Sequence, residues 1–143
     1  MRRYATLPRT YLVTDIEGSK KLSPDAVAQA QSFVERALSE RGGRVVSVEG
    51  DAVVAWFTTV QEAVRAAAAV QDDAPVKVRI GIAPRRNAAR RVSDAGHGGQ
   101  ALLSWTARRA LGRTLRRVGL GLHQLDPDAD FPPPRRGLLR RLV

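Results

Sequence analysis

Two carboxylates and a Gly-Ser pair follow the first apolar run of the chain. The run Tyr11–Val13 is typical of a β-strand, which places Asp15 at or just past its carboxyl end. Gly18 and Ser19 then predict a bend whose backbone N–H groups can meet an anion. A carboxylate beside such a bend suits a site for a metal and a phosphate. Short Asp/Gly turns are also common in solvated loops, so this stretch alone leaves both interpretations open.

A second acidic turn lies further along the chain. Glu49-Gly50-Asp51 separates a weakly alternating stretch, 44–48, from a strongly apolar one, 52–57, and predicts a tight hairpin. If the first strand is central and lies beside the second and third, its carboxyl end comes close to this hairpin. We therefore expect Asp15 and Asp51 to come within reach of one hard cation such as Mg²⁺.

The elements that must position these carboxylates follow a regular order. Ser23-Pro24-Asp25 predicts the start of a helix that ends at Gly42-Gly43, and Thr58-Thr59 can cap a second helix. The alternating residues 76–82 predict a fourth strand. The resulting order, strand-helix-strand-strand-helix-strand, is that of a ferredoxin-like split β-α-β core, so we expect an α+β fold with helices packed on a mostly antiparallel sheet.

A C-terminal αβ extension follows this core. Its predicted elements are an Arg-rich helix at 84–93, a short strand at 101–103, a helix at 105–111, a strand at 118–122 and a closing edge strand at 138–143. The length of 143 residues favours a single domain over residues 10–143, preceded by a polar lead-in at 1–9.

Composition narrows the classes of function. The net charge is +10 and is carried mainly by Arg, which favours anionic partners such as nucleotides or other phosphorylated small ligands. The absence of Cys excludes disulfides and thiolate metal sites. No apolar stretch approaches the roughly 20 residues of a membrane span and no signal peptide is evident, so a cytoplasmic protein without membrane attachment is expected. Nucleic acid is not the expected partner, because no helix-turn-helix, zinc or aromatic RNA-reading signature accompanies the Arg pairs.

Several short motifs occur in a characteristic order along the chain. These motifs are Thr14–Ser19, Gly42-Gly43, Gly50-Asp51, Arg79–Ile82, Asn87 with Arg91, and His97–Ser104. Together they resemble the catalytic domain of the bacterial class III adenylate/guanylate cyclases, the cyclase homology domain. The resemblance extends from about Thr10 to the C-terminus and rests on the joint order of the motifs.

The resemblance implies a two-metal mechanism. Asp15 and Asp51 would bind two divalent metals, Mg²⁺ or Mn²⁺, that hold a nucleoside triphosphate while its ribose 3′-hydroxyl attacks the α-phosphate and expels pyrophosphate. Asn87 and Arg91 would come from the other subunit of a head-to-tail dimer, orient the ribose and stabilise the transition state. A homodimer, or a dimer with another cyclase domain, is therefore the expected assembly.

Backbone groups complete the implied site. Ile16 would offer its carbonyl oxygen to a metal, and the backbone of Gly18 and Ser19 would meet the terminal phosphates. From the residues alone, however, Asn87 and Arg91 lie four apart on an exposed helix, and a solvated surface explains them equally well.

The departures from the family pattern concern substrate recognition. Ser47 stands where the family has a Lys that reads the purine base, and it is too short for that contact. The segment that normally precedes Asn87 and borders the dimer interface is missing. Asp126 follows His123-Gln124-Leu125 where a phosphate-binding Lys is often found, and Ala52 replaces the Gly after the second aspartate.

The sequence therefore predicts a shortened, divergent class III cyclase-like domain in nucleotide signalling. It is expected to bind metal and a nucleotide or signalling nucleotide with little or no cyclase turnover, as a pseudoenzyme. Two alternatives stay open: an active minimal purine nucleotide cyclase, and a dimerisation or protein-interaction module without catalysis. Loss of a charged phosphate contact typically slows such chemistry about a hundredfold, which favours the first interpretation.

Overall fold

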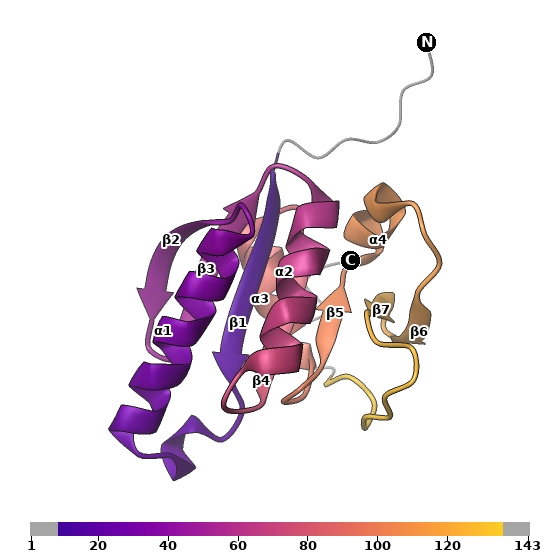
Figure 1. The fold of residues 1–143 in the computed structure, drawn as a ribbon. Coiled ribbons are helices and arrows are strands. Elements are labelled where there is room, and N and C mark those ends of the chain that lie inside the picture. Colours follow the sequence, from indigo (N-terminus) through magenta and orange to yellow (C-terminus); the bar gives the residue numbers. More distant parts are fainter. Residues whose placement is uncertain (1–8, 136–143) are drawn as a thin grey trace.

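The computed structural model describes residues 9–135, which form a sheet with helices on both of its faces (Figure 1). The sheet has seven strands in the order β2-β3-β1-β4-β5-β7-β6. All neighbouring strands are antiparallel except β4 and β5. The predicted α+β fold with a ferredoxin-like core is therefore confirmed.

From the first strand to the fourth helix, the elements follow the chain in the predicted order. The strands are β1 (Thr10–Ile16), β2 (Arg44–Glu49), β3 (Ala52–Phe57), β4 (Val78–Ala83), β5 (Ala101–Leu103), β6 (Arg116–Gly119) and β7 (Leu122–Gln124). The helices are α1 (Pro24–Glu40), α2 (Val60–Asp73), α3 (Arg86–Ala95) and α4 (Trp105–Leu111), with a 3-10 turn, η1 (Ser19–Lys21), after β1.

Local signals explain where the two long helices begin. The Ser23 hydroxyl accepts a hydrogen bond from the Ala26 N–H at 3.1 Å, and the Thr59 hydroxyl accepts one from the Glu62 N–H at 3.2 Å. Each bond satisfies a backbone donor that the first helical turn leaves free. The caps fix where α1 and α2 begin, and the spacing of their apolar residues places one face of each helix against the sheet.

The core is divided between the two faces of the sheet. One cluster fills the space under α1, α2 and α4 and contains Leu12 and Phe57, both fully buried. A smaller cluster lies under α3 and contains Val13. Since successive strand residues point to opposite faces, neighbours on β1 belong to different clusters. Asp15, two residues after Val13, therefore lies on the α3 face.

The backbone of helix α3 lies in direct contact with the backbone of strand β4. A Cβ atom at Gly81 would lie 2.2 Å from the Ser93 nitrogen and 2.3 Å from the Ala89 carbonyl oxygen, so no larger residue fits without a shift of the helix. Glycine at this strand position marks a close approach of two backbones. The distance of α3 from the sheet is therefore set by Gly81.

Two details of the topology differ from the predictions. β1 lies between β3 and β4, while β2 is the edge strand, so β1 does not lie beside the second strand as expected. The single strand predicted at 118–122 is instead the hairpin between β6 and β7. Gly119, Leu120 and Gly121 all have positive φ, which interrupts a strand and forms the turn.

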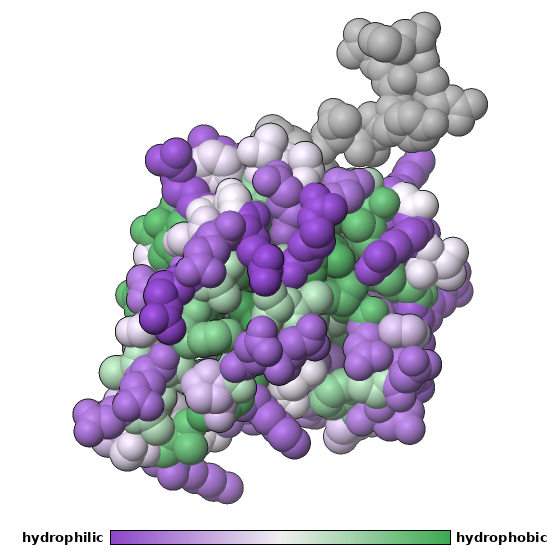
Figure 2. Space-filling model, viewed as in Figure 1, coloured by the Kyte–Doolittle hydropathy of each residue, from purple (hydrophilic) through white to green (hydrophobic). Residues whose placement is uncertain are grey.

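Some predictions lie outside the part of the chain that the structure describes. The edge strand at 138–143 and most of the lead-in at 1–9 belong to this group, and the domain boundaries stay predictions. Among the helices of residues 9–135, none combines the length and the apolar composition that crossing a membrane requires. Figure 2 shows that the face bearing α1 and α2 carries many hydrophilic side chains with smaller apolar patches between them.

Candidate nucleotide and metal site

Asp15 forms an ion pair with Arg79 on the neighbouring strand. The two residues are direct partners in the register of β1 and β4. Arg79 Nη2 lies 2.7 Å from Asp15 Oδ1 and 2.7 Å from Oδ2, and Arg79 Nε lies 3.3 Å from Oδ1. The side chains are only 15% and 14% exposed. The carboxylate assigned to a metal by the sequence is thus neutralised by a guanidinium group from the same chain.

A second carboxylate, from α3, lies in the field of this pair. Burial, and then the negative charge of Asp15, raise the pKa of the Asp94 carboxyl above its ordinary value of 3.8, although Arg79 opposes the shift. Burial lowers the pKa of Arg79 more than any other single cause, but the hydrogen bonds to Asp15 together with the negative charges of nearby carboxylates outweigh it and leave the pKa above its ordinary value. The charges of Asp15, Arg79 and Asp94 therefore act on one another at the α3 face of the sheet.

Glu17 connects the end of β1 to two distant segments. Its carboxylate accepts a hydrogen bond from the Gly98 N–H at 3.1 Å and pairs with Arg135, while His97 Nδ1 lies 3.9 Å away. The Arg135 N–H in turn donates to the Ala95 carbonyl at 2.9 Å. The Gly98 hydrogen bond lowers the pKa of Glu17, and Arg135 adds to the effect. No sequence signal indicated these contacts, because the partners are 81 and 118 residues away from Glu17.

The predicted phosphate turn follows immediately. Gly18 has φ of +73°, a conformation that favours glycine, and its carbonyl accepts the Lys21 N–H at 2.9 Å to close η1. Ser19 starts η1, and the buried Ile16 pairs with Val78 in the sheet. The bend predicted at Gly18 and Ser19 is present, while a role for these residues and for the Ile16 carbonyl in binding stays a prediction.

Asp51 lies in the turn between β2 and β3. Gly50 has φ of +62°, and its carbonyl accepts a hydrogen bond from the Gln31 side chain of α1, which anchors the turn. Within residues 9–135, the Asp51 carboxylate has no hydrogen bond or ion pair. The same part of the chain contains no group of three or more His, Asp or Glu residues placed to hold a metal ion.

Ser47 belongs to a polar cluster that joins β2 to α3. Its hydroxyl donates to Glu49 at 2.8 Å and accepts from Arg86 Nη2 at 2.7 Å. Glu49 also pairs with Arg86, and with Arg90 at 2.9 Å. The Ser47 hydroxyl, followed by Arg86, lowers the pKa of Glu49. The position that the resemblance assigns to base recognition is therefore engaged in holding the edge strand against α3.

Asn87 and Arg91 lie on α3, each one residue after a member of this cluster. Asn87 is exposed and Arg91 is half-buried, and neither side chain has a hydrogen-bond partner within the described residues. Their spacing of four places them on one face of the helix. The roles that the resemblance assigns to these two side chains in a dimer stay predictions.

A divalent metal is the cofactor implied by the resemblance, and the donors do not fit it in this conformation. Asp15 has both oxygens bound to Arg79, and a metal would have to displace a bidentate, charge-assisted pair. Asp51 and the Ile16 carbonyl alone are too few ligands for a closed Mg²⁺ site.

Comparison with solved structures identifies the class of the fold. An adenylate cyclase from Trypanosoma brucei in its monomeric state matches with a TM-score of 0.73 at 19% identity, covering 94% of this chain and 95% of that one. The adenylyl cyclase CyaB from P. aeruginosa matches with a TM-score of 0.61 at 18% identity, over 72% and 79% of the two chains. The fold of this protein is therefore that of the class III adenylate/guanylate cyclase domains, which confirms the resemblance at the level of the fold.

Comparison of the sequence with known families and proteins does not assign this chain to a family. No protein-family model matches the chain. Among curated proteins, the uncharacterized proteins Rv0891c from Mycobacterium tuberculosis and Mb0915c from Mycobacterium bovis are 33% identical to it over 119 residues. The match covers 66% of this chain and 42% of each relative, so the chain spans about two-fifths of their length.

Proposed function

We propose that this chain is a divergent class III cyclase-like domain that binds a nucleotide or signalling nucleotide with little or no cyclase turnover. The Asp15–Arg79 ion pair carries this proposal. Two-metal cyclisation requires a carboxylate that is free to coordinate, and here Arg79 Nη2 lies within 2.7 Å of both oxygens of Asp15.

The surroundings of the site support the same function. Ser47 is bound to Arg86 rather than directed to a ligand, so the domain has lost its expected base reader. Gly18 and Ser19 keep a bend suited to an anion, with Lys20 and Lys21 directly after it. A nucleotide would therefore be held mainly through its phosphates, with weak discrimination between bases, and metal would bind only after Arg79 releases Asp15.

One observation favours the second candidate, an active minimal cyclase. Asn87 and Arg91 lie on one face of α3 without a partner in the described residues, ready to act on a nucleotide held by a second copy. In such a homodimer Arg91 would stabilise the charge that develops on the α-phosphate, and Asn87 would orient the ribose.

The test combines binding and turnover. The purified chain is incubated with Mn²⁺ and each of ATP, GTP, CTP and UTP, cyclic product and pyrophosphate are quantified, and nucleotide binding is measured by calorimetry. Asp15→Asn probes the site, and Asp128→Asn, a change of an exposed carboxylate in a loop, is its matched control. Arg91→Ala is paired with Arg41→Ala at the exposed end of α1.

Each outcome distinguishes the candidates. Binding of nucleotides without cyclic product supports the proposal. Cyclic product that disappears in Asp15→Asn and Arg91→Ala, but persists in both controls, contradicts it and supports the active cyclase. Absence of nucleotide binding at millimolar concentration leaves the third alternative, a dimerisation or interaction module.

A further inference from the structure

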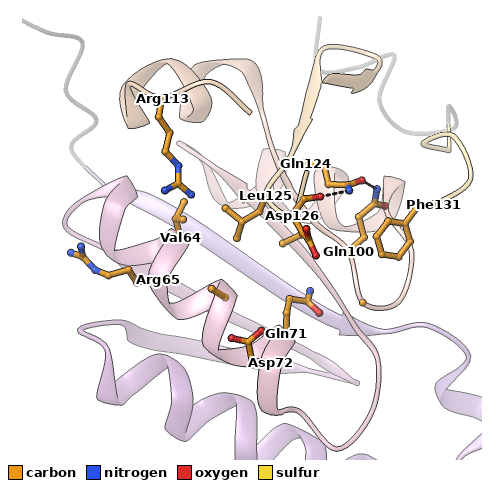
Figure 3. Close-up of a pocket in the computed structure, with 13 residues that line it drawn as sticks. Val64, Arg65, Gln71, Asp72, Gln100, Arg113, Gln124, Leu125, Asp126 and Phe131 are labelled. Carbon is orange, nitrogen blue, oxygen red and sulfur yellow. Dashed lines mark hydrogen bonds between the residues drawn. The ribbon is translucent and has the colours of Figure 1, made fainter. Parts of the chain in front are cut away.

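A cavity of about 400 Å³ lies on the α2 side of the sheet, away from the α3 face that holds Asp15 and Arg79. It is enclosed by α2, by the beginning of β5, and by the chain that follows β7 as far as Phe131 (Figure 3). This volume is in the range of cavities that accept small organic molecules. The cavity contains none of the residues assigned to metal binding, base recognition or catalysis, although it includes Asp126, which stands where the family often has a phosphate-binding Lys. A ligand in this cavity does not depend on the proposed nucleotide binding.

One wall of the cavity is held in place by side-chain amides. Gln100 and Gln124 are each only 2% exposed. Gln100 Nε2 donates to Gln124 Oε1 at 2.8 Å, and Gln124 Nε2 donates to the Ala129 carbonyl at 2.7 Å (Figure 3). The His97 N–H donates to Gln100 Oε1 at 3.1 Å. Because these buried amides are bonded to protein on both ends, they fix the segment after β7 beside β5 and preform the cavity.

The interior of the cavity is mainly apolar. Val64 and Ala101 are buried core residues that line it. Leu125 and Phe131 lie across the cavity from α2 (Figure 3). Ala68 lies on the exposed surface of α2 at the edge of the cavity, and its small side chain leaves the entrance open. A ligand with a flat or compact apolar body matches this lining.

Charged groups of opposite sign lie at different ends of the rim. Arg113, just after α4, extends toward Val64 at one end (Figure 3). Asp72, at the end of α2, and Asp126, after β7, lie toward the other end. Within residues 9–135, none of the three takes part in an ion pair. Asp126 Oδ1 accepts a hydrogen bond from the Asp128 N–H at 3.1 Å, so this carboxylate keeps its second oxygen and its charge for a ligand.

We propose that this cavity binds a small zwitterionic molecule with a planar apolar body. Its acidic group would pair with Arg113, and its amino group with Asp72 and Asp126. Two charge-assisted contacts at opposite ends select a ligand by both charge and length. Singly charged molecules of the same shape would keep only one of the two contacts.

The probe for this proposal is 4-(aminomethyl)benzoate, which carries a carboxylate and an ammonium group across an aromatic ring. Benzoate and benzylamine are its single-ended controls. Calorimetry and amide chemical shifts should show binding of the probe about tenfold tighter than either control, which corresponds to about 1.4 kcal/mol. The largest shifts are expected at Ala68, Gly99 and Leu125, which line the cavity.

Two variants localise the effect. Ala68→Trp fills the entrance from an exposed helix position and should abolish binding, while its amide spectrum shows whether the fold is kept. Arg113→Glu should weaken the binding of 4-(aminomethyl)benzoate about tenfold. Arg109→Glu, an equal charge change on α4 over Trp105 and outside the cavity, should leave binding unchanged. No binding of the probe, equal binding of the three molecules, or binding that survives Ala68→Trp in a folded protein would overturn the proposal.

Discussion

Arg79 and Asp15 are paired across β4 and β1 with both carboxylate oxygens 2.7 Å from a single guanidinium nitrogen. Each side chain neutralises the charge of the other, which would otherwise be unpaired in a mostly buried position. Pairs of this kind contribute little when compared with an apolar replacement, but removal of one partner is costly because the remaining charge stays desolvated.

The coupling of this pair is measurable in a double-mutant cycle. We expect Asp15→Asn and Arg79→Gln each to lower the free energy of unfolding by about 2–4 kcal/mol, and the double variant to lose much less than the sum. Urea unfolding at neutral pH provides the three differences. Additive losses would show that the two side chains do not depend on each other.

Removal of the guanidinium group should also expose Asp15 to cations. Arg79→Gln is expected to bind Mn²⁺ about tenfold more tightly than the unaltered chain, because the carboxylate no longer has a competing partner. Calorimetric titration with MnCl₂ measures the change. The double variant Asp15→Asn/Arg79→Gln serves as the control, and a gain in affinity that persists in it would place the metal elsewhere.

Asp94 should make the fold less stable as the pH rises. Its pKa is raised in the folded state, first by burial and then by Asp15, so the folded state disfavours ionisation. Stability contributed by the protonated form is present below the ordinary pKa of 3.8 and is lost as the pH rises through the folded pKa. Asp94→Asn should therefore unfold at higher urea concentration than the unaltered chain at pH 7.

The difference between these two proteins should vanish at about pH 3, where both carry a neutral side chain at this position. A stabilisation by Asp94→Asn that is equal at both pH values would mean that the amide gains contacts of its own, and that ionisation is not the cause.

His123 should make the fold less stable as the pH falls. Burial lowers its pKa below the ordinary 6.5, and the positive charges of Arg108 and Arg117 lower it further. The unfolded chain therefore binds a proton more readily, and stability falls as the pH drops below 6.5. Thermal unfolding between pH 7 and pH 5 should show a smaller loss in His123→Gln than in the unaltered chain. Arg117→Gln, which removes one neighbouring charge, should give an intermediate loss.

Gly81 should tolerate no side chain. An alanine Cβ would lie 2.2 Å from the Ser93 nitrogen, so Gly81→Ala must push α3 from the sheet, at a cost of about 3 kcal/mol. Gly96→Ala is the matched control, because its Cβ would meet nothing closer than 3.3 Å. Urea midpoints compare the two, and similar values would show that α3 moves freely.

Local chemistry made much of the fold predictable. The caps at Ser23 and Thr59, the apolar faces of the helices and the turn at Gly50 each act within a few residues, and the structure has the corresponding elements. The hairpin within residues 116–124 was missed because Leu120 adopts a positive φ that its residue type does not indicate.

The state of the candidate site depends on pairings over long distances. Asp15 was recognised as a candidate ligand, but its pairing with Arg79 joins residues 64 apart and follows only from the register of β1 and β4. The same holds for Ser47 and Arg86, which are 39 apart. The residue types indicate which side chains are able to bind a ligand. The register of the strands determines which of these side chains are already paired with other residues of the protein.

The loop before β5 has a practical consequence for solution studies. The Gly98 amide is bonded to Glu17 beside the cyclase-type site, and the next residue, Gly99, lines the cavity under α2. Glycine amides usually resonate apart from the crowded region of a nitrogen-correlated spectrum. The amide signals of these two neighbouring residues can therefore report on ligand binding separately in a single titration, Gly98 for the cyclase-type site and Gly99 for the cavity.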